Sequence, residues 1–264
     1  MATRTMSEWQ TSIAEVVSTD DEEEVIVRGH RLSDLIGSVS FSEAMFLMLQ
    51  SRMPSKPEAR VLDALLVASI EHGIAPPSMI SRCFASYGTS IQAAVGGGIL
   101  AFGDRMGGLG EQLAKLMVDS LADLDLTDPS LSDDVLAAKA RQVVAESQAR
   151  GERLPGYGIP LHGADPRAPK VLAVAKAEGT FGAYCRFANL LEQELGNARG
   201  GRPVPMNLDG VSAAVILDLG FPWGSTRMFL LTPRSVSMGA HFLEEQEQDS
   251  TWRHIPADQI TYTG

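Results

Sequence analysis

Apolar side chains recur every three or four residues along most of the chain, and this spacing predicts helices. The stretch Glu58–His72 shows the pattern, and it is followed by Gly73, a residue typical of helix ends. Pro76-Pro77 is expected to begin a further unit. The other expected helices cover residues 42–50, 90–102, 111–124, 132–150, 168–176, 182–195, 206–219 and 227–247.

Strand signals are scarce. Val25–Val27 is a short β-branched run before Arg28-Gly29-His30, and we expect it to form one strand of a small hairpin. No β-rich runs alternate with the helical patterns, which argues against Rossmann and TIM-barrel architectures. The sequence therefore predicts an all-α fold preceded by a polar, solvated segment over residues 1–24.

Composition narrows the class of protein further. The 264 residues are 44% hydrophobic, which is enough for a sizeable core in one large domain or two coupled ones. The net charge of −11 disfavours nucleic acid as a partner. The sequence contains two cysteines, and it shows no CxxC or HExxH spacing, so we expect neither disulfides nor a bound metal. It also shows no apolar leader and no long apolar run, so we expect a cytoplasmic protein without a membrane span.

Several short motifs follow one another in a fixed order. Near the start, Val27–His30 precedes Asp34-Leu35 and the run Phe41–Ala44. Further on, Glu71–Gly73 stands about 30 residues before Gly103–Gly108 (GDRMGG). The later motifs are Gly156-Tyr157-Gly158, Asp165-Pro166-Arg167, Asn207-Leu208-Asp209-Gly210, the RSVSMGAH run from Arg234, and Trp252-Arg253-His254.

In their order and spacing, these motifs resemble the citrate synthase superfamily over residues 25–264, in particular the short citryl-CoA lyase type and the lyase module of ATP-citrate lyase. The resemblance implies an all-α dimer with large and small helical domains and an active site in the cleft between them. By analogy, residues 25–103 and 213–264 would form the large domain and 104–212 the small one.

The resemblance assigns three arginines to the carboxylates of a small dicarboxylate or oxo acid: Arg167, Arg234 and Arg253. A planar guanidinium suits this task because it donates two parallel hydrogen bonds. In the family, the arginine matching Arg253 reaches into the site of the partner subunit. Taken singly, each could equally be a surface residue or one that satisfies a helix end.

Asp209 matches the family's catalytic carboxylate, which exchanges a proton with the carbon next to the thioester. Its apolar neighbours Leu208 and Val211 predict a raised pKa. The alternative is a helix N-cap, and both roles are compatible. His72 matches a histidine that contacts the dicarboxylate, with a role at a helix end as the alternative.

Two departures from the family pattern bear on mechanism. Met106 stands where citrate synthases carry the histidine that polarises the thioester carbonyl, whereas the ATP-citrate lyase module has phenylalanine there. Ile159 replaces a histidine that exchanges a proton with the substrate oxygen. His162, three residues later, is the candidate replacement, with an exposed loop residue or a CoA contact as the alternative. We expect His241 to be a packing residue.

Coenzyme A, as acyl-CoA substrate or product, is the implied cofactor, and Gly156, Tyr157, Gly158 and Ile159 are the residues expected to line it. The favoured reaction is retro-Claisen cleavage of citryl-CoA, or a related 3-hydroxy-3-carboxyacyl-CoA, to acetyl-CoA and an oxo acid such as oxaloacetate. The alternatives are a catalytically weakened CoA- and dicarboxylate-binding regulatory or partner subunit, and condensation with a different oxo acid. A helical dimer without a ligand is the least favoured interpretation.

Overall fold

The β-branched run at Val25–Val27 forms a strand, as expected, and the sheet around it extends into the segment that was predicted to be polar and solvated. The computed structural model describes residues 9–21, 23–158 and 165–264. Its antiparallel sheet pairs Ala14 with Val27 and Val27 with His30. The strands are β1 Ala14–Ser18, β2 Glu23–Val27 and β3 His30–Arg31.

The turn between β2 and β3 accounts for the Arg28-Gly29 pair. Both residues have positive φ, 48° and 81°, as a two-residue turn matching the twist of a hairpin requires. The Arg28 guanidinium donates to the Met48 carbonyl from Nη2 at 2.8 Å. The turn therefore fixes the hairpin and also attaches it to the helix that contains Met48.

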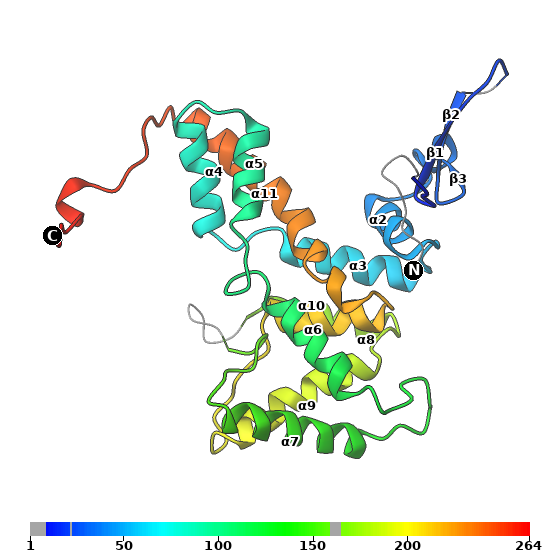
Figure 1. Ribbon diagram of the computed structural model, residues 1–264. Coiled ribbons are helices and arrows are strands. Elements are labelled where there is room, and N and C mark those ends of the chain that lie inside the picture. Colours follow the sequence, from blue (N-terminus) through cyan, green and yellow to red (C-terminus); the bar gives the residue numbers. More distant parts are fainter. Residues whose placement is uncertain (1–8, 22, 159–164) are drawn as a thin grey trace. The chain divides into compact units, whose positions relative to one another are not determined.

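The rest of the described chain is helical, which confirms a mainly helical fold with a small sheet at its start. Figure 1 shows the helices in chain order. Their bounds are α1 Leu32–Leu35, α2 Phe41–Gln50, α3 Lys56–Ser69, α4 Pro76–Ser86, α5 Ile91–Leu100, α6 Leu109–Ser120, α7 Asp133–Ala149, α8 Arg167–Ala177, α9 Ala183–Asn197, α10 Leu208–Asp218 and α11 Met228–Glu247, with short 3-10 turns at Trp223–Ser225 and Ala257–Gln259.

Polar residues before the helices set several of these starts. Ser40 caps α2, and its capping box with Glu43 satisfies backbone N–H groups at the start of that helix. Ser132 caps α7 by accepting the Val135 N–H at 3.4 Å. The end of α3 differs from the prediction, because the helix stops at Ser69 and leaves Glu71 outside it. The Glu71 carboxylate binds side chains of α11, and these bonds hold the segment after α3.

The chain forms two compact units, residues 1–63 and 64–264. In the second unit, α4, α5 and α11 pack on one another. α10 packs against α6, α8 and α9, and α7 packs on α9 (Figure 1). α10 is almost wholly buried, so apolar residues cover all its sides instead of one face. The division into large and small domains stays a prediction.

Candidate active site

Asp209 lies in the first turn of the central helix α10. The cap of this helix is Asn207, whose side chain accepts the Gly210 N–H at 3.2 Å. Asp209 is therefore not the cap, and its carboxylate is free for another role. It accepts a hydrogen bond from the backbone N–H of Gly110, in the first turn of α6. Two helix N-termini thus face one carboxylate.

Burial raises the pKa of Asp209, as its apolar neighbours predicted. The Gly110 hydrogen bond and the charges of Arg167 and Arg234 lower the pKa, while nearby Asp165 raises it. Burial outweighs these opposing effects. A raised pKa makes the protonated form of a carboxyl group more accessible, which suits general acid–base chemistry.

Arg167, at the start of α8, is held by a two-point ion pair. Its Nε and Nη2 donate to the Asp165 carboxylate at 2.9 and 2.8 Å, and its backbone N–H donates at 3.0 Å. Asp165 also accepts the Leu208 N–H at 3.1 Å, which ties this arginine to the start of α10. The Nη1 of Arg167 is buried and finds no hydrogen-bond partner within the described part of the chain.

Arg234 projects from α11 and is only 7% exposed. Burial lowers its pKa; the charges of Glu71 and Asp209 raise the pKa, and that of Arg167 lowers it. Its Nη1 donates to Glu71 at 3.4 Å, while its buried Nε has no partner among the residues described. The structure thus brings Asp209, Arg167 and Arg234 into one cluster with donors left for a bound anion.

The segment containing Gly156 and Gly158, predicted to line CoA, pairs with the chain that leads into α10. The Gly158 N–H donates to the Pro205 carbonyl at 2.8 Å, and the Asn207 N–H donates to the Gly156 carbonyl at 3.0 Å. Gly156 has a φ of +83°, and a side chain there would stand 2.8 Å from the Gly210 Cα. This close approach requires glycine and fixes the start of α10.

Tyr157 points inward, where its hydroxyl donates to the Ala188 carbonyl at 2.8 Å and burial raises its pKa well above the usual range. Its ring is therefore committed to packing on α9. Ile159 and His162 lie outside the described residues. Their predicted roles stay predictions, as does the contact of this loop with CoA.

His72 is exposed in the turn after α3, and its backbone N–H donates to the Glu71 carboxylate at 2.7 Å. The neighbouring Glu71 binds Arg234, so His72 stands next in the chain to a residue that contacts the cluster. A direct contact between His72 and a dicarboxylate stays a prediction.

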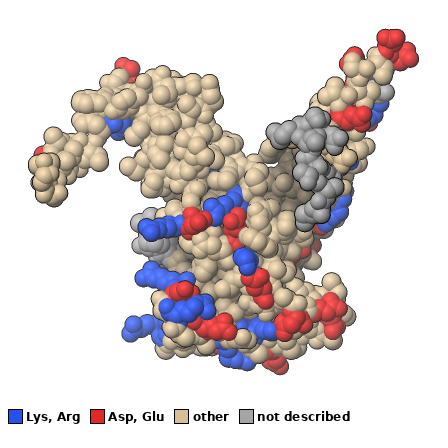
Figure 2. Space-filling model, viewed as in Figure 1, with Lys and Arg blue, Asp and Glu red and all other residues tan. Residues whose placement is uncertain are grey.

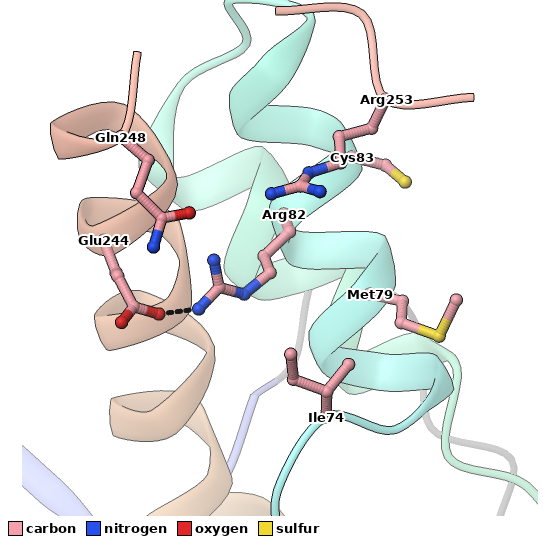
Figure 3. Close-up of a pocket in the computed structure, with 7 residues that line it drawn as sticks. All are labelled: Ile74, Met79, Arg82, Cys83, Glu244, Gln248 and Arg253. Atoms are coloured by element: carbon pink, nitrogen blue, oxygen red, sulfur yellow. Dashed lines mark ion pairs between the residues drawn. The ribbon is translucent and has the colours of Figure 1, made fainter. Parts of the chain in front are cut away.

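Arg253 lies apart from the cluster in its own chain. It forms an ion pair with Glu245, a fully buried residue eleven positions beyond Arg234 on α11, or about 16 Å along the helix axis. Its predicted action in the site of a partner subunit stays a prediction. An open pocket of about 440 Å³ beside it is lined by Ile74, Met79, Arg82, Cys83, Glu244, Gln248 and Arg253 (Figure 3).

Ion pairs with Arg227 hold the loop that carries Met106. Arg227 stands at the N-cap position of α11 and pairs with Asp104 and with Glu111, the latter at 3.1 Å. Met106 itself is 59% exposed. The position where citrate synthases carry a histidine is thus held in place but bears a thioether, which donates no hydrogen bond.

No role was predicted for Asp165, Glu71 or Arg82, although each contacts a candidate residue or its partner. Asp165 directly precedes Pro166-Arg167, so its position two residues before an arginine was a usable signal. Glu71 and Arg82 contact residues about 160 positions away, as the sequence separations of 163 show. Such long-range pairs leave no local pattern.

Comparison with known proteins decides the family. The sequence profile of the citrate synthase C-terminal domain matches residues 48–255, which is more than half of the chain. This chain belongs to the citrate synthase family.

Within the family, the short lyase type predicted from the motifs is confirmed. The citryl-CoA lyase of Hydrogenobacter thermophilus is 31% identical with a TM-score of 0.84, covering 97% of this chain and 94% of that one. The ATP citrate lyase of Methanothrix soehngenii, solved with citrate and coenzyme A, has a TM-score of 0.80 over 100% of this chain and 42% of that one. Its identity of 19% supports the fold alone.

Curated relatives are longer than this chain. A Mycobacterium tuberculosis protein provisionally named citrate synthase 2 is 29% identical over 219 residues, which are 80% of this chain and 54% of that protein. The chain therefore spans about half of the length of this relative. In the described ranges, no helix is long and apolar enough to cross a bilayer, and no group of acidic, histidine and cysteine side chains is arranged to hold a metal.

Proposed function

We propose that this protein cleaves citryl-CoA, or a related 3-hydroxy-3-carboxyacyl-CoA, into acetyl-CoA and an oxo acid such as oxaloacetate. The cluster of Asp209, Arg167 and Arg234 carries this proposal. It combines a carboxyl group of raised pKa with two arginines that each have a buried N–H without a hydrogen-bond partner among the described residues. This is the donor set that a substrate with several carboxylates next to a reactive carbon needs.

In this reaction the tertiary hydroxyl of the substrate loses its proton as the adjacent C–C bond breaks. The hydroxyl carbon becomes the ketone of the oxo acid, and the electron pair of the bond moves into the thioester enolate. Asp209, in its protonated form, then gives its proton to the enolate carbon and so forms the methyl group of acetyl-CoA. Arg167 and Arg234 hold the carboxylates that remain on the oxo acid.

The hydroxyl proton needs an acceptor, and we assign this role to His162, with His72 binding a substrate carboxylate or the hydroxyl. The chain segment Gly156–Ile159 would line coenzyme A, and Arg253 would complete the site of a partner subunit. CoA and citryl-CoA are bound by ATP citrate lyases of this fold, which supports the choice of thioester.

One observation favours cleavage over synthesis. Met106 cannot donate a hydrogen bond to a thioester carbonyl, and loss of one such donor typically costs about 10² to 10³ in rate. Condensation with a different oxo acid remains the related alternative.

A homodimer in the cytoplasm is part of the proposal. α4, α5 and α11 expose large apolar side chains, and charged residues are sparse over this part of the molecule in Figure 2. Exposed apolar surface of this kind marks an interaction site. The exposed residues are Met79, Phe84, Ile91, Leu100, Val236 and Leu243.

A binding subunit without catalysis is the second candidate, favoured by Met106 and Ile159 at two histidine positions. A coupled assay that follows acetyl-CoA and oxaloacetate release from citryl-CoA separates the two. Cleavage by the wild type, lost in Asp209→Asn and kept in the exposed control Asp119→Asn on α6, supports the lyase. If the protein binds CoA but cleaves neither citryl-CoA nor any related thioester in a panel, the lyase proposal fails.

A further inference from the structure

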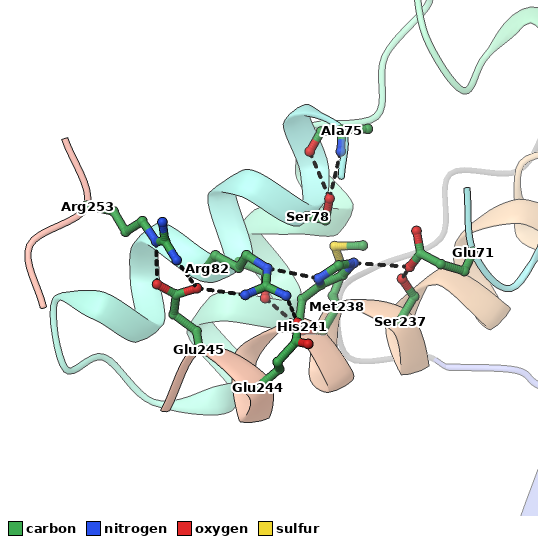
Figure 4. A network of polar contacts seen from close by, with 11 residues as sticks. Glu71, Ala75, Ser78, Arg82, Ser237, Met238, His241, Glu244, Glu245 and Arg253 are labelled. Atoms are coloured by element: carbon green, nitrogen blue, oxygen red, sulfur yellow. Dashed lines mark hydrogen bonds and ion pairs between the residues drawn. The ribbon is translucent and has the colours of Figure 1, made fainter. Parts of the chain in front are cut away.

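A stripe of polar residues runs along one face of α11 and reaches the candidate site. Arg234, Ser237, His241 and Glu245 are spaced three or four residues apart, so their side chains share one face of the helix. Each meets a charged partner outside α11, as Figure 4 shows for Ser237, His241 and Glu245. Buried polar networks are costly unless every member is satisfied, so this stripe calls for a role.

Glu71 is the point where the stripe meets the site. One oxygen of its carboxylate accepts from Arg234 at 3.4 Å and from the backbone N–H of His72 at 2.7 Å. The other accepts from the Ser237 hydroxyl and lies 3.2 Å from His241 Nε2. Burial raises the pKa of Glu71, but these hydrogen bonds and the charge of Arg234 outweigh it and hold the pKa below its usual value.

The tautomer of His241 follows from its contact with Arg82. Arg82 Nε donates to His241 Nδ1 at 3.0 Å. A guanidinium can only donate, so Nδ1 must be the acceptor and the ring proton must sit on Nε2, facing Glu71. Arg82 is fixed in turn by the fully buried Glu245, at 2.8 Å, and by Glu244.

This arrangement offsets the repulsion between the two arginines of the cluster. Arg234 and Arg167 repel each other, and Arg167 already has Asp165 as its counter-ion. Among the described residues, Glu71 is the only one that forms an ion pair with Arg234. A long arginine side chain that lost this partner would be free to turn away from its like-charged neighbour.

We propose that Glu71, His241 and Arg82 are positioning residues that keep Arg234 and His72 oriented toward a substrate carboxylate. His241 acts through Glu71 and touches no substrate. The inference rests on the proposed function in so far as Arg234 binds the carboxylate. Loss of the His241 hydrogen bonds should then weaken carboxylate binding and leave CoA binding as it is.

Two substitutions separate positioning from packing. His241→Phe keeps a ring of similar size without hydrogen bonds, whereas His241→Gln offers an amide oxygen to Arg82 and an amide N–H to Glu71. We expect His241→Phe to weaken citrate and oxaloacetate binding about tenfold, the scale of a hydrogen bond to a charged group. We expect His241→Gln to restore most of it. Gln246→Ala, exposed on the same helix, is the matched control.

Binding is measured by calorimetry for citrate, oxaloacetate and CoA separately, beside the melting temperature of each variant. The expected result is weaker carboxylate binding in His241→Phe, rescue in His241→Gln, and CoA affinity within about twofold of the wild type throughout. Where the wild type turns citryl-CoA over, the KM for citryl-CoA should rise in His241→Phe with little change in kcat. Equal carboxylate affinity in the wild type and His241→Phe would overturn the inference and leave the proposed function standing.

The tautomer of His241 gives an independent reading that needs no substrate and no variant. Nitrogen-15 NMR of the free wild-type protein should show a protonated Nε2 and an unprotonated Nδ1. A proton on Nδ1 instead would contradict the chain of hydrogen bonds, even if His241→Phe failed to fold. A correct tautomer in a wild type that binds no carboxylate would refute the proposed function, and the positioning role with it.

Discussion

Each end of α10 carries a largely buried aspartate, and the two carboxylates differ in how completely the protein satisfies the donors around them. Burial raises the pKa of both Asp209 and Asp218. The Asp218 carboxylate accepts backbone N–H groups from Gly182, Tyr184 and Cys185 at 2.9 to 3.0 Å. These groups lie at the start of α9, where helices have unpaired donors, so Asp218 completes that helix end.

Among the described residues, Asp209 accepts the backbone N–H of Gly110, and the two arginines nearby have buried N–H groups without a hydrogen-bond partner. In the proposed function, the donors beside Asp209 bind a substrate that is released after turnover. The backbone donors around Asp218 are instead bound by its own carboxylate. A raised pKa does not distinguish the two residues, because burial produces it in both. The unsatisfied donors beside the carboxylate do.

The largest effect should come from Asp209→Asn. The amide keeps the shape of the side chain but cannot deliver a proton, so we expect kcat for citryl-CoA cleavage to fall about 10² to 10⁴-fold. The melting temperature should not fall, since the helix is capped by Asn207. Steady-state kinetics beside thermal denaturation measure both, and an unchanged kcat would remove the distinction between the two ends.

Asp218→Ala should show the reverse behaviour. It leaves buried N–H groups at the start of α9 unpaired, and we expect the free energy of unfolding to fall by about 3–5 kcal/mol. Denaturant titration measures this loss. KM and kcat of the folded fraction should stay near wild-type values, and a large selective loss of turnover would give Asp218 a role in the site.

Arg234→Lys tests the donors beside Asp209. Lysine keeps the positive charge but loses the planar fork, so we expect the KM for citryl-CoA to rise about tenfold, the scale of one hydrogen bond to a charged group. Lys115→Arg, at an exposed position on α6, is the reverse exchange outside the cluster and should change nothing. A KM that is equally insensitive to Arg234→Lys would mean that the substrate carboxylate binds elsewhere.

The smallest effect is a pH dependence of stability. Folded Asp209 keeps its proton to a higher pH than an unfolded aspartate, whose pKa is about 4. Its contribution to stability is therefore present below that pH and is lost as pH rises through the raised pKa. Asp209→Asn does not ionise, so its melting temperature should gain on the wild type as pH rises. A gain that shrinks with rising pH would contradict the raised pKa.

Local patterns predicted the helices and Asp209 but not the network around them. Apolar spacing placed α2 and α7 within a residue or two of their observed ends. The predicted end of α3 was wrong, because Glu71 lies outside the helix and binds Arg234 and Ser237 of α11, contacts that leave no local pattern. His241 was expected to be a packing residue, although its spacing from Arg234 and Glu245 on one helix face was readable in the sequence.

Proton exchange on acetyl-CoA tests the role of Asp209 most directly, because it isolates the proton transfer from C–C bond cleavage. In D2O, with oxaloacetate or an unreactive analogue bound, the wild type should replace the methyl protons of acetyl-CoA with deuterium, as followed by proton NMR. Asp209→Asn should exchange them at least about 10²-fold more slowly, while Asp119→Asn should match the wild type. Exchange by Asp209→Asn at the wild-type rate would show that another group moves the proton.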